Sequence, residues 1–526
     1  MPKIIINKLN FIYEGFYEPI FVDLSAELDS SWKLGLVGRN GMGKTTLLRL
    51  LTGELPAEGA ISAQVAFDYF PPLVQEKETT LQAIRALIAD FDGMEQEILA
   101  CAASAANDRE ALQRYGELQQ YYQQLDGYII DELIEAEVGR LGVTAEALQR
   151  PFATLSGGER TKVMLAALFL KKDNFLLIDE PTDHLDLEGR RAVASYLSSK
   201  KGFILVSHDR RFLDAIIDHV LVLEKKRVTL RQGSFSAYLE DKQREDAAEL
   251  ERNERLQQQI SSLERSARQK RTWSDRVEAT KIGHGVGDRG YVGHKAAKMM
   301  KRALTIERRQ DTAIAEKRAL LKHIDYAPEL RIGNLPYHRR ILVEARELTL
   351  SYGDMPLFAP RTFAISTTER IALRGANGSG KTTLLKAIMG AMQPHSGILR
   401  IGSGLRISLV AQETAFLHGD LREYALAEGI DESLFKAILR KLDFLRSDFE
   451  KDMANFSQGE KKKVLLAASL SAPSHLYLWD EPLNFIDYYS REQILQLLCA
   501  YQPTMLFVEH DQFFCEQVAT RYIDLG

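Results

Sequence analysis

Short apolar runs rich in β-branched residues alternate with longer amphipathic stretches along most of the chain. Residues 33–37, 175–178 and 202–206 are runs of the short type. Short buried strands that alternate with amphipathic helices are typical of a mainly parallel sheet flanked by helices. The pattern therefore predicts an α/β fold for the parts of the chain that contain it.

Two long stretches depart from this alternation. Residues 94–142 are rich in Ala, Glu, Leu and Gln and contain no Pro, which favours helix. Residues 241–280 contain neither Gly nor Pro and carry alternating charges with few apolar positions, which predicts a solvated helix about 60 Å long. Five glycines within 283–293 do not fit a helix, and helix signals return over 295–323. We therefore expect a long helical hairpin with a glycine-rich tip.

The rest of the sequence contains the same set of motifs twice, in the same order. GRNGMGKTTLL at 38–48 matches GANGSGKTTLL at 375–385, an offset of 337 residues. LIDEPTDHLD at 177–186 matches LWDEPLNFID at 478–487, an offset of 301. The fall in offset means that the first copy holds 36 extra residues between these motifs. The predicted domains are a first cassette at 1–239 with a helical insertion at about 82–145, the hairpin linker at 240–335, and a second cassette at 336–526.

Each copy begins with a glycine-rich loop that fits the phosphate-loop pattern GxxxxGK[ST]. In this pattern, glycines let backbone N–H groups surround phosphate oxygens, the lysine neutralises the β- and γ-phosphates, and the hydroxyl residue ligates Mg²⁺. Each loop follows an apolar strand and opens a helix-forming run, which is the context that the motif requires. The predicted nucleotide contacts are Gly38, Asn40, Gly41, Gly43, Lys44, Thr45 and Thr46 in the first copy and Gly375, Asn377, Gly378, Gly380, Lys381, Thr382 and Thr383 in the second.

An acidic pair and a histidine follow later apolar strands in both copies. The Asp of each pair ends a strand, as a magnesium-associated carboxylate does, and the Glu after it is placed to orient and polarise the attacking water. The histidine suits a sensor of the γ-phosphate. A solvated turn and a structural histidine are the alternatives, but the whole set recurs in both copies. The predicted metal ligands are Thr45, Asp179, Thr382 and Asp480, and the predicted catalytic residues are Glu180, Glu481, His208 and His510.

The composition of the chain argues against a disordered, a disulfide-rich and a membrane-spanning protein. Of the 526 residues, 45% are apolar and 27% are charged, which is ordinary globular usage and excludes wholesale disorder. Three cysteines are too few and too scattered for a disulfide framework or a CxxC metal site, which suits a reducing cytosol. The longest apolar run, 163–170, is far shorter than the roughly 18 residues of a membrane span, and the first residues lack a signal peptide. We expect a cytoplasmic protein that is not by itself a transporter.

These motifs resemble the ATP-binding cassette superfamily. SGGE at 156–159 and SQGE at 457–460 are similar to its signature motif, with Gly157 replaced by Gln458 in the second copy. The resemblance implies that ATP is the nucleotide and that two cassettes meet head to tail. Each ATP then lies between one phosphate loop and the other cassette's signature, whose helix N-terminus faces the γ-phosphate, and a monomer can form both sites. The further contacts that the resemblance implies are Ser156, Gly158, Ser457 and Gly459 in the signatures, Tyr13 and Tyr352 beside adenine, and Gln412 in the Q-loop.

The Q-loop of the first copy has two candidates. Gln75 keeps the 337-residue offset from Gln412, whereas matching the strand VAFDYFPP to LRISLVAQ puts Pro72 at that position. The adenine contacts also have an alternative, because a core tyrosine fits the positions of Tyr13 and Tyr352.

The whole chain resembles one family within this superfamily, the ABC-F proteins, which are associated with the translating ribosome. Two cassettes, a helical linker, an insertion in the first cassette and no transmembrane domain carry the resemblance, which covers essentially all 526 residues. Three features resemble those of one branch of this family. They are the glycine-rich tip, the sequence DEPLNFID at 480–487 and an end at Leu525-Gly526 without an extension. Members of that branch protect ribosomes from lincosamides, streptogramin A and pleuromutilins.

The resemblance implies an ATPase that binds the exit-tRNA site of the ribosome in its closed, two-ATP state and leaves after hydrolysis. The linker then points toward the peptidyl-transferase centre, where it displaces a bound drug or remodels a stalled peptidyl-tRNA. A housekeeping ABC-F translation factor is the close alternative. The energising subunit of a membrane exporter is a more distant one, because a basic hairpin has no evident use there.

Local charge agrees with a ribosomal partner. Residues 261–310 hold thirteen Lys and Arg against five Asp and Glu, a net charge of +8, whereas the whole chain carries −5. A basic hairpin on an acidic body suits binding to rRNA phosphates, and a solvated spacer is the alternative. The candidate phosphate contacts are Arg265, Arg268, Lys270, Arg271, Lys295, Lys298, Lys301, Arg302, Arg308 and Arg309.

Overall fold

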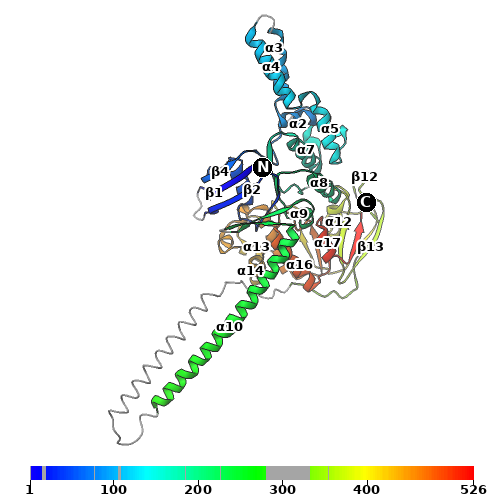
Figure 1. The fold of residues 1–526 in the computed structure, drawn as a ribbon. Helices are drawn as coiled ribbons and strands as arrows, with labels where there is room; N and C mark the ends of the chain where they lie inside the picture. The colour runs from blue at the N-terminus through cyan, green and yellow to red at the C-terminus, as the bar shows by residue number, and fades with distance from the viewer. Residues whose placement is uncertain are drawn as a thin grey trace, which may run out of the picture. The chain divides into compact units, whose positions relative to one another are not determined.

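The computed structural model describes residues 2–14, 19–75, 77–104, 108–183, 185–224, 227–279, 332–353 and 355–526. Their contacts divide them into two units, one that holds both sequence repeats and one that begins at Ala237. Within the first unit, each repeat forms its own antiparallel and mainly parallel sheets with surrounding helices, and the second repeat adds a two-stranded sheet of residues 351–352 and 355–356 (Figure 1). The α/β fold with two cassettes that the sequence predicts is confirmed.

The first repeat contains an antiparallel sheet and a larger, mainly parallel sheet. The strands are β1 Lys3–Phe11, β2 Phe21–Asp29, β3 Lys33–Val37, β4 Glu58–Ala63, β5 Ala66–Phe70, β6 Asn174–Asp179, β7 Phe203–Val206, β8 His219–Glu224 and β9 Arg227–Gln232. The antiparallel sheet has the order β2-β1-β4, and the larger one has the order β5-β6-β7-β3-β8-β9. Ile4 and Ile6 of β1 belong to the same buried cluster as Leu34 and Leu36 of β3, so one core joins the two sheets.

The second repeat has the same architecture. Its strands are β10 Ile341–Thr349, β11 Ser351–Tyr352, β12 Met355–Pro356, β13 Arg361–Ser366, β14 Arg370–Arg374, β15 Ser396–Ile401, β16 Ile407–Val410, β17 Leu476–Asp480, β18 Met505–Val508 and β19 Arg521–Asp524. The antiparallel sheet has the order β13-β10-β15 and the parallel sheet the order β16-β17-β18-β14-β19. The second order matches β5-β6-β7-β3-β8, so the repeat in sequence is also a repeat in topology.

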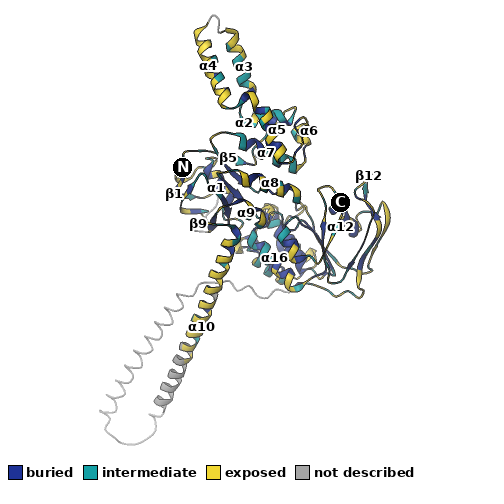
Figure 2. Cartoon of the chain, turned by 45° about the vertical axis from the view of Figure 1, so that its right-hand side comes forward, coloured by how far each residue is buried: buried dark blue, intermediate teal, exposed yellow. Residues whose placement is uncertain are grey.

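The central strands are buried along nearly their whole length, as Figure 2 shows by their dark blue colour. Parallel strands read as continuous apolar runs because helices cover both faces of the sheet. The run at 175–178 lies inside β6, and each of its residues is at most 2% exposed. The runs at 33–37 and 202–206 correspond to β3 and β7. These predicted strands are confirmed.

Helices follow the strands in both repeats. Those of the first repeat are α1 Lys44–Leu51, α2 Thr80–Ile88, α3 Phe91–Ser104, α4 Arg109–Gln124, α5 Ile130–Arg140, α6 Ala145–Leu148, α7 Gly157–Leu170, α8 Leu187–Ser199 and α9 Arg210–Ile216. Those of the second are α12 Lys381–Ile388, α13 Leu421–Ala427, α14 Glu432–Lys441, α15 Gln458–Ser471, α16 Tyr488–Tyr501 and α17 Gln512–Val518. Short 3₁₀ helices lie at η1 Gly127–Ile129, η2 Phe152–Thr154, η4 Arg446–Glu450 and η5 Met453–Asn455.

The helical insertion predicted in the first repeat is the pair α3 and α4. The two helices lie side by side as a hairpin (Figure 1), and Asp108 caps the second of them through its side chain. In the second repeat α14 follows α13 after only a short turn, with no helix between them among the described residues. The 36 extra residues inferred from the two offsets therefore form this hairpin.

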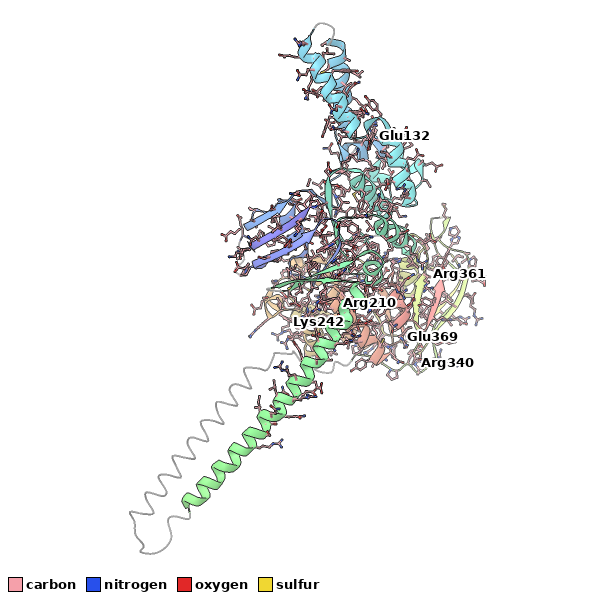
Figure 3. All side chains as sticks on the ribbon, viewed as in Figure 1. Glu132, Arg210, Lys242, Arg340, Arg361 and Glu369 are labelled. Atoms are coloured by element: carbon pink, nitrogen blue, oxygen red, sulfur yellow. The ribbon has the colours of Figure 1, made fainter. Side chains whose placement is uncertain are left out.

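The linker begins with one long helix, α10 Phe235–Ala279. It starts after Gly233, whose φ is +124°, and most of its described side chains are exposed (Figure 2). The first turn is fixed to the cassette, because Arg210 Nε donates to Ser236 Oγ at 2.8 Å; Arg210 is labelled in Figure 3. The helix predicted over 241–280 is confirmed as far as Ala279, where the described stretch 227–279 ends, and it starts earlier because no residue after Gly233 breaks it.

Several expectations for the linker lie outside the described residues. These are the tip at 283–293, the second helix at 295–323 and the candidate phosphate contacts from Lys295 to Arg309. In the part of the chain that the structure describes, no helix is both long and apolar enough to cross a membrane.

Candidate functional site

The nucleotide motifs of each repeat lie at the carboxyl ends of three neighbouring strands. In the first repeat, β3 leads into the phosphate loop, β6 ends at Asp179 and β7 leads to His208. In the second repeat, β14, β17 and β18 do the same for the second phosphate loop, Asp480 and His510. Carboxyl ends of adjacent parallel strands form one edge of a sheet, where α/β proteins bind ligands. The fold therefore brings each predicted set together.

Both phosphate loops have a backbone conformation that favours glycine. Gly43 has a φ of +87° and Gly380 a φ of +88°, in the left-handed region where other residues are strained. A Cβ on Gly43 would also lie 2.5 Å from Cγ2 of Ile20. The tight turn leaves the N-terminus of the following helix facing the loop, where backbone N–H groups are available to an anion.

The phosphate-loop lysines are buried and directed at their own loops. Lys44 Nζ donates to the carbonyl oxygen of Gly38, and Lys381 Nζ to that of Gly375, each at 2.8 Å. Burial lowers the pKa of both lysines from 10.5, although nearby carboxylates oppose the shift. A desolvated ammonium group attracts phosphate more strongly than an exposed one.

The predicted metal ligands are paired in each repeat. Thr45 Oγ1 donates to Asp179 Oδ2 at 2.6 Å, and the Thr382 hydroxyl hydrogen-bonds to Asp480. Burial raises the pKa of Asp480, and its Oδ1 is buried without a hydrogen-bond partner among the described residues. Carboxylate and hydroxyl oxygens are ligands that Mg²⁺ accepts. The residues present fit a magnesium ion at both sites.

Tyr69, which belongs to none of the nucleotide motifs, also contacts Asp179, the predicted metal ligand of the first repeat. Its hydroxyl donates to Asp179 Oδ2 at 3.0 Å. Burial and the charge of Asp179 raise the pKa of Tyr69, so it remains a donor at neutral pH. Leu409 occupies the equivalent strand position in the second repeat. The sequence match between VAFDYFPP and LRISLVAQ could have identified Tyr69. It puts Tyr69 on β5, the strand next to β6, which ends at Asp179.

Glu481 of the second repeat is surrounded by hydrogen-bond donors. Gln412 Nε2 and Asn484 Nδ2 donate to its Oε2 at 2.9 and 2.7 Å, and His510 Nε2 lies 3.6 Å from its Oε1. Burial alone would raise the pKa of Glu481, but the hydrogen bond and charge of His510, with Lys462, lower it overall. Glu481 is therefore a carboxylate at neutral pH, held by two amides.

Glu180 of the first repeat has a different environment. His208 Nε2 lies 3.2 Å from its Oε1, but not in hydrogen-bond geometry, because that oxygen is buried without a partner among the described residues. Burial and repulsion by Asp183 and Asp179 raise the pKa of Glu180 well above its usual value. Burial also lowers the pKa of His208, and the neighbouring Lys44 adds to this shift. The two repeats thus differ at the glutamates that the sequence predicts to orient water.

The strand registers align Pro72 with the Q-loop glutamine. Phe70 in β5 occupies the place of Val410 in β16, since each pairs with the equivalent residue of the neighbouring strand. Two residues further along each chain segment, Pro72 of the first repeat is therefore equivalent to Gln412 of the second. Gln75 lies three residues further along the loop and is exposed. The structure favours Pro72 at this position, and a nucleotide contact of Gln75 stays a prediction.

The signature motifs begin two helices with the same capping arrangement. The side chains of Ser156 and Ser457 accept hydrogen bonds from the backbone N–H of Glu159 and Glu460, whose carboxylates bond back to the serine N–H groups. This arrangement fixes the helix N-terminus, which carries the positive end of the helix dipole. Gly158 of the first signature is partly exposed.

The second signature meets the phosphate loop of the first repeat. Asn40 Nδ2 donates to the carbonyl oxygen of Phe485 at 3.0 Å. A Cβ on Gly459 would lie 2.5 Å from that oxygen and 2.9 Å from Asn40 Nδ2, so a larger residue does not fit. Gln458, the departure from the usual glycine, accepts a hydrogen bond from Thr414 Oγ1 at 2.7 Å. This approach agrees with the head-to-tail arrangement that the resemblance implies.

Other side chains also join the two repeats. Arg39 Nη1 lies 2.7 Å from Asp443 Oδ1, and its guanidinium carbon is 5.4 Å from the centre of the Tyr489 ring. Arg211 Nη1 donates to Gln512 Oε1 at 3.0 Å, between the equivalent helices α9 and α17. The first phosphate loop is therefore bordered by residues of the second repeat.

A buried ion pair supports the loops of each site and was not predicted. Arg190 pairs with Asp209 at 3.0 Å, and Arg491 pairs with Asp511 at 3.1 Å. Each aspartate directly follows the predicted sensor histidine and caps the next helix. The signal was present in the sequence, because these arginines and aspartates repeat at offsets of 301 and 302 residues.

Of the two tyrosines predicted to contact adenine, the structure describes the side chain of Tyr13 only. The Tyr13 hydroxyl is 3.1 Å from Thr46 Oγ1, its ring meets Phe11 edge to face, and 36% of the residue is exposed. The ring therefore lies beside the first phosphate loop, and its stacking on adenine stays a prediction. The side chain of Tyr352 lies outside the described part of the chain.

The sequence of this chain is similar to those of known proteins. A family profile described as ABC transporter matches residues 21–183 and 359–484, more than half of the chain. The chain is 28% identical over 522 residues to the energy-dependent translational throttle protein EttA of Mycobacterium tuberculosis, covering 96% of this chain and 88% of that protein. It is 26% identical over 540 residues to ABC transporter F family member 2 of Arabidopsis thaliana, covering 98% and 75%.

A solved structure agrees at the level of fold. The archaeal ribosome recycling factor aABCE1, solved in complex with the ribosomal stalk protein aP1, gives a TM-score of 0.57 at 18% identity, over 96% of this chain and 85% of that chain. Because the family profile covers both repeats, and the same strand order carries the nucleotide motifs in each, the chain belongs to the ABC transporter family as a tandem ATP-binding cassette ATPase.

Proposed function

We propose that this chain is a cytoplasmic ABC-F ATPase that binds the ribosome and protects its peptidyl-transferase centre from bound antibiotics. The observation that carries the proposal is the basic stretch 261–310, with a net charge of +8, between two ATP-binding cassettes. A segment of that charge suits rRNA phosphates. Because the stretch lies between the two cassettes in the chain, we infer that ATP binding and hydrolysis in both cassettes control its position on the ribosome.

In this proposal each cassette uses its strand-end residues to bind and hydrolyse ATP. The glycine-rich loop and its lysine hold the phosphates, and the histidine contacts the γ-phosphate. The glutamate after the strand orients the attacking water. A bound Mg²⁺ would neutralise the negative charge that develops on the phosphates. The residues assigned to hold it are Thr45, Asp179, Thr382 and Asp480, and those assigned to the water and the γ-phosphate are Glu180, Glu481, His208 and His510.

The named relatives support a role in translation. One is named an energy-dependent translational throttle protein and another a member of the F family, and both match nearly the whole chain. The glycine-rich tip and the sequence DEPLNFID support the branch that protects ribosomes. We therefore assign the ATP-bound state to the exit-tRNA site, with hydrolysis as the step that releases the protein.

The experiment separates ribosome binding from drug protection. Residues 283–293 are replaced by a short Gly-Ser turn, and the variant is compared with the parent by ribosome co-sedimentation with ATP, by drug release from isolated ribosomes and by resistance of cells. We expect normal co-sedimentation and ATP hydrolysis, because the basic residues on both sides of the replaced segment supply affinity. Drug release and resistance should fall sharply, because the tip acts at or beside the drug.

The outcomes distinguish the candidate functions. Failure of the parent to co-sediment with ribosomes in ATP would contradict the ribosomal role. Co-sedimentation without any effect on drug release favours a housekeeping translation factor of the same family. Full protection by the shortened variant would show that the tip is a passive turn.

A further inference from the structure

The second repeat holds its water-orienting glutamate with two amide donors. Gln412 Nε2, from the loop after β16, and Asn484 Nδ2, from the loop after β17, both donate to Glu481 Oε2, at 2.9 and 2.7 Å. Two donors on one oxygen restrict rotation of the carboxylate. The other oxygen, Oε1, is left beside His510, whose Nε2 is 3.6 Å away.

The first repeat has no amide at either position. The strand registers place Pro72 where the second repeat has Gln412, and the 301-residue offset places Asp183 where it has Asn484. A proline side chain has no polar atom, and an ionised aspartate only accepts hydrogen bonds. In the part of the chain that the structure describes, Glu180 Oε1 is buried without a hydrogen-bond partner.

The donors of the first repeat are directed at the neighbouring carboxylate instead. Thr45 Oγ1 and the Tyr69 hydroxyl both donate to Asp179 Oδ2, at 2.6 and 3.0 Å. Leu409, at the position of Tyr69 in the second repeat, has no group to donate. Asp480 accepts one such bond, from Thr382. The first repeat therefore holds its strand-end carboxylate with one donor more than the second, whereas the second holds the glutamate after the strand with two donors that the first repeat lacks.

From this difference we propose that the two ATP sites have unequal roles, so that the site of the second cassette hydrolyses ATP and the site of the first cassette mainly retains it. The proposal rests on the roles assigned above to Glu180 and Glu481. A carboxylate activates water well only when it is held in the reactive orientation. Hydrogen bonds to a charged group are strong enough for the loss of one or two to change a rate by about tenfold to a hundredfold.

The first experiment measures each site separately. Single-turnover cleavage of the γ-phosphate is followed in Glu180→Gln and in Glu481→Gln, and the nucleotide that stays bound to the parent is identified after rapid separation. We expect Glu481→Gln to slow cleavage at least about tenfold more than Glu180→Gln does. The parent should retain a fraction of bound ATP that is not cleaved.

The second experiment exchanges the donors between the repeats. Pro72→Gln with Asp183→Asn, introduced into Glu481→Gln, should raise the residual cleavage by about tenfold. Asp183→Asn alone is a milder variant that keeps the backbone of the loop. The reverse change removes both amide donors from the second repeat. Asn484→Asp with Gln412→Ala, introduced into Glu180→Gln, should lower the cleavage of ATP that remains in Glu180→Gln by a similar factor. Affinity for a fluorescent ATP analogue, which a disrupted site would lose, should stay within about twofold in the variants that keep Gln412.

The results distinguish this inference from the proposal on which it rests. Equal losses from Glu180→Gln and Glu481→Gln, or no gain from Asp183→Asn with or without Pro72→Gln, would contradict unequal sites while leaving both glutamates in the mechanism. Unchanged cleavage in both single variants and in their combination would remove the glutamates from the mechanism altogether.

Discussion

In the proposed mechanism, single residues determine whether the nucleotide sites hydrolyse ATP or only bind it. Glu180 and Glu481 follow their strands in the left-handed conformation, with φ of +46° and +47°. The phosphate-loop lysines Lys44 and Lys381 donate instead to carbonyl oxygens of their own loops. The side chains of the two glutamates face the position of the attacking water in the proposed mechanism. Binding and hydrolysis should therefore be separable by changing the carboxylates alone.

The first prediction concerns the double variant Glu180→Gln with Glu481→Gln. It should bind ATP as the parent does, because the phosphate-loop contacts of Lys44 and Lys381 are unchanged, but it should lose the base that orients water at both sites. A fall in hydrolysis of at least about a hundredfold is expected. The protein should then stay on ribosomes, as co-sedimentation with ATP would report. Normal hydrolysis, or no increase in ribosome occupancy, would contradict the assignment.

The second prediction concerns Lys462, which is 1% exposed. Its Nζ donates to the carbonyl oxygen of Ala411 at 2.8 Å and to those of Gln412 and Asp480 at 3.3 Å. Burial lowers its pKa from 10.5 to about 8, although Asp480 attracts the charge. Because the folded state holds this proton less tightly than the unfolded state, stability should rise with pH between about 8 and 10.5, by about 3 kcal/mol in total.

Urea denaturation across this range checks the Lys462 prediction. Lys462→Thr copies Thr161, the residue at the same position of the first repeat. The free energy of unfolding of the parent minus that of the variant should increase by about 3 kcal/mol between pH 7.5 and 10.5. Lys461→Thr, at a partly exposed neighbour, is the control and should leave the parent's pH dependence in place. A constant difference across the range would show that burial of Lys462 does not perturb its charge.

At the scale of elements, α5 of the first repeat is fixed to α8 by a buried polar cluster. Glu137 Oε2 accepts hydrogen bonds from the Tyr196 hydroxyl at 2.6 Å and from Lys200 Nζ at 2.7 Å. Burial alone would raise the pKa of Glu137, but Lys200 and Tyr196 lower it overall. The second repeat has Ile438 and Leu497 at the two helix positions, both buried. The same interface is thus polar in one repeat and apolar in the other.

The third prediction follows from that difference. Glu137→Ala leaves a half-buried ammonium and a buried hydroxyl without their acceptor, which should lower the free energy of unfolding by about 3 kcal/mol. The variant Glu137→Ile, Tyr196→Leu, Lys200→Tyr copies the second repeat and should recover most of that loss, because a packed apolar contact replaces the whole cluster. Urea denaturation of the two variants measures both effects. If the triple variant is less stable than Glu137→Ala, the two interfaces are not interchangeable.

At the scale of the whole molecule, the proposed function depends on a basic segment attached to an acidic body. The fourth prediction reverses Lys298, Lys301, Arg302 and Arg309 to Glu, which changes the net charge of 261–310 from +8 to 0. Ribosome binding should weaken, and the slope of log affinity against log salt should flatten by about one unit or less for each phosphate group that the linker no longer binds. ATP affinity should hardly change, because screening limits charge effects to about 10 Å at 0.1 M salt.

The control for this prediction changes the total charge by the same amount on the cassettes. Reversal of Arg109, Lys386, Arg400 and Arg422, all exposed, should leave the salt slope of ribosome binding near that of the parent. Equal slopes for the linker variant and the parent would show that the ribosome contact lies elsewhere. Equal losses of affinity in the linker and control variants would mean that total charge, and not the linker, determines binding.

The sequence alone predicted the elements that depend on local constraints. The phosphate loops follow from glycines at Gly43 and Gly380, because few other residues adopt a positive φ there. The parallel strands follow from continuous apolar runs, and α10 from a stretch without Gly or Pro. The repeat also predicted which strand ends carry Asp179 and Asp480, since the order of motifs is the same in both copies.

Tertiary structure decided which side chains surround those motifs, because the contacts join residues that are far apart in the chain. Tyr69 reaches Asp179 across 110 positions, and Gln412 reaches Glu481 across 69. Whether a strand residue faces a carboxylate depends on the register between strands, and a shift of one residue would turn it to the other face. The sequence therefore determined that two cassettes bind nucleotide, whereas packing determined that their two glutamates have different partners.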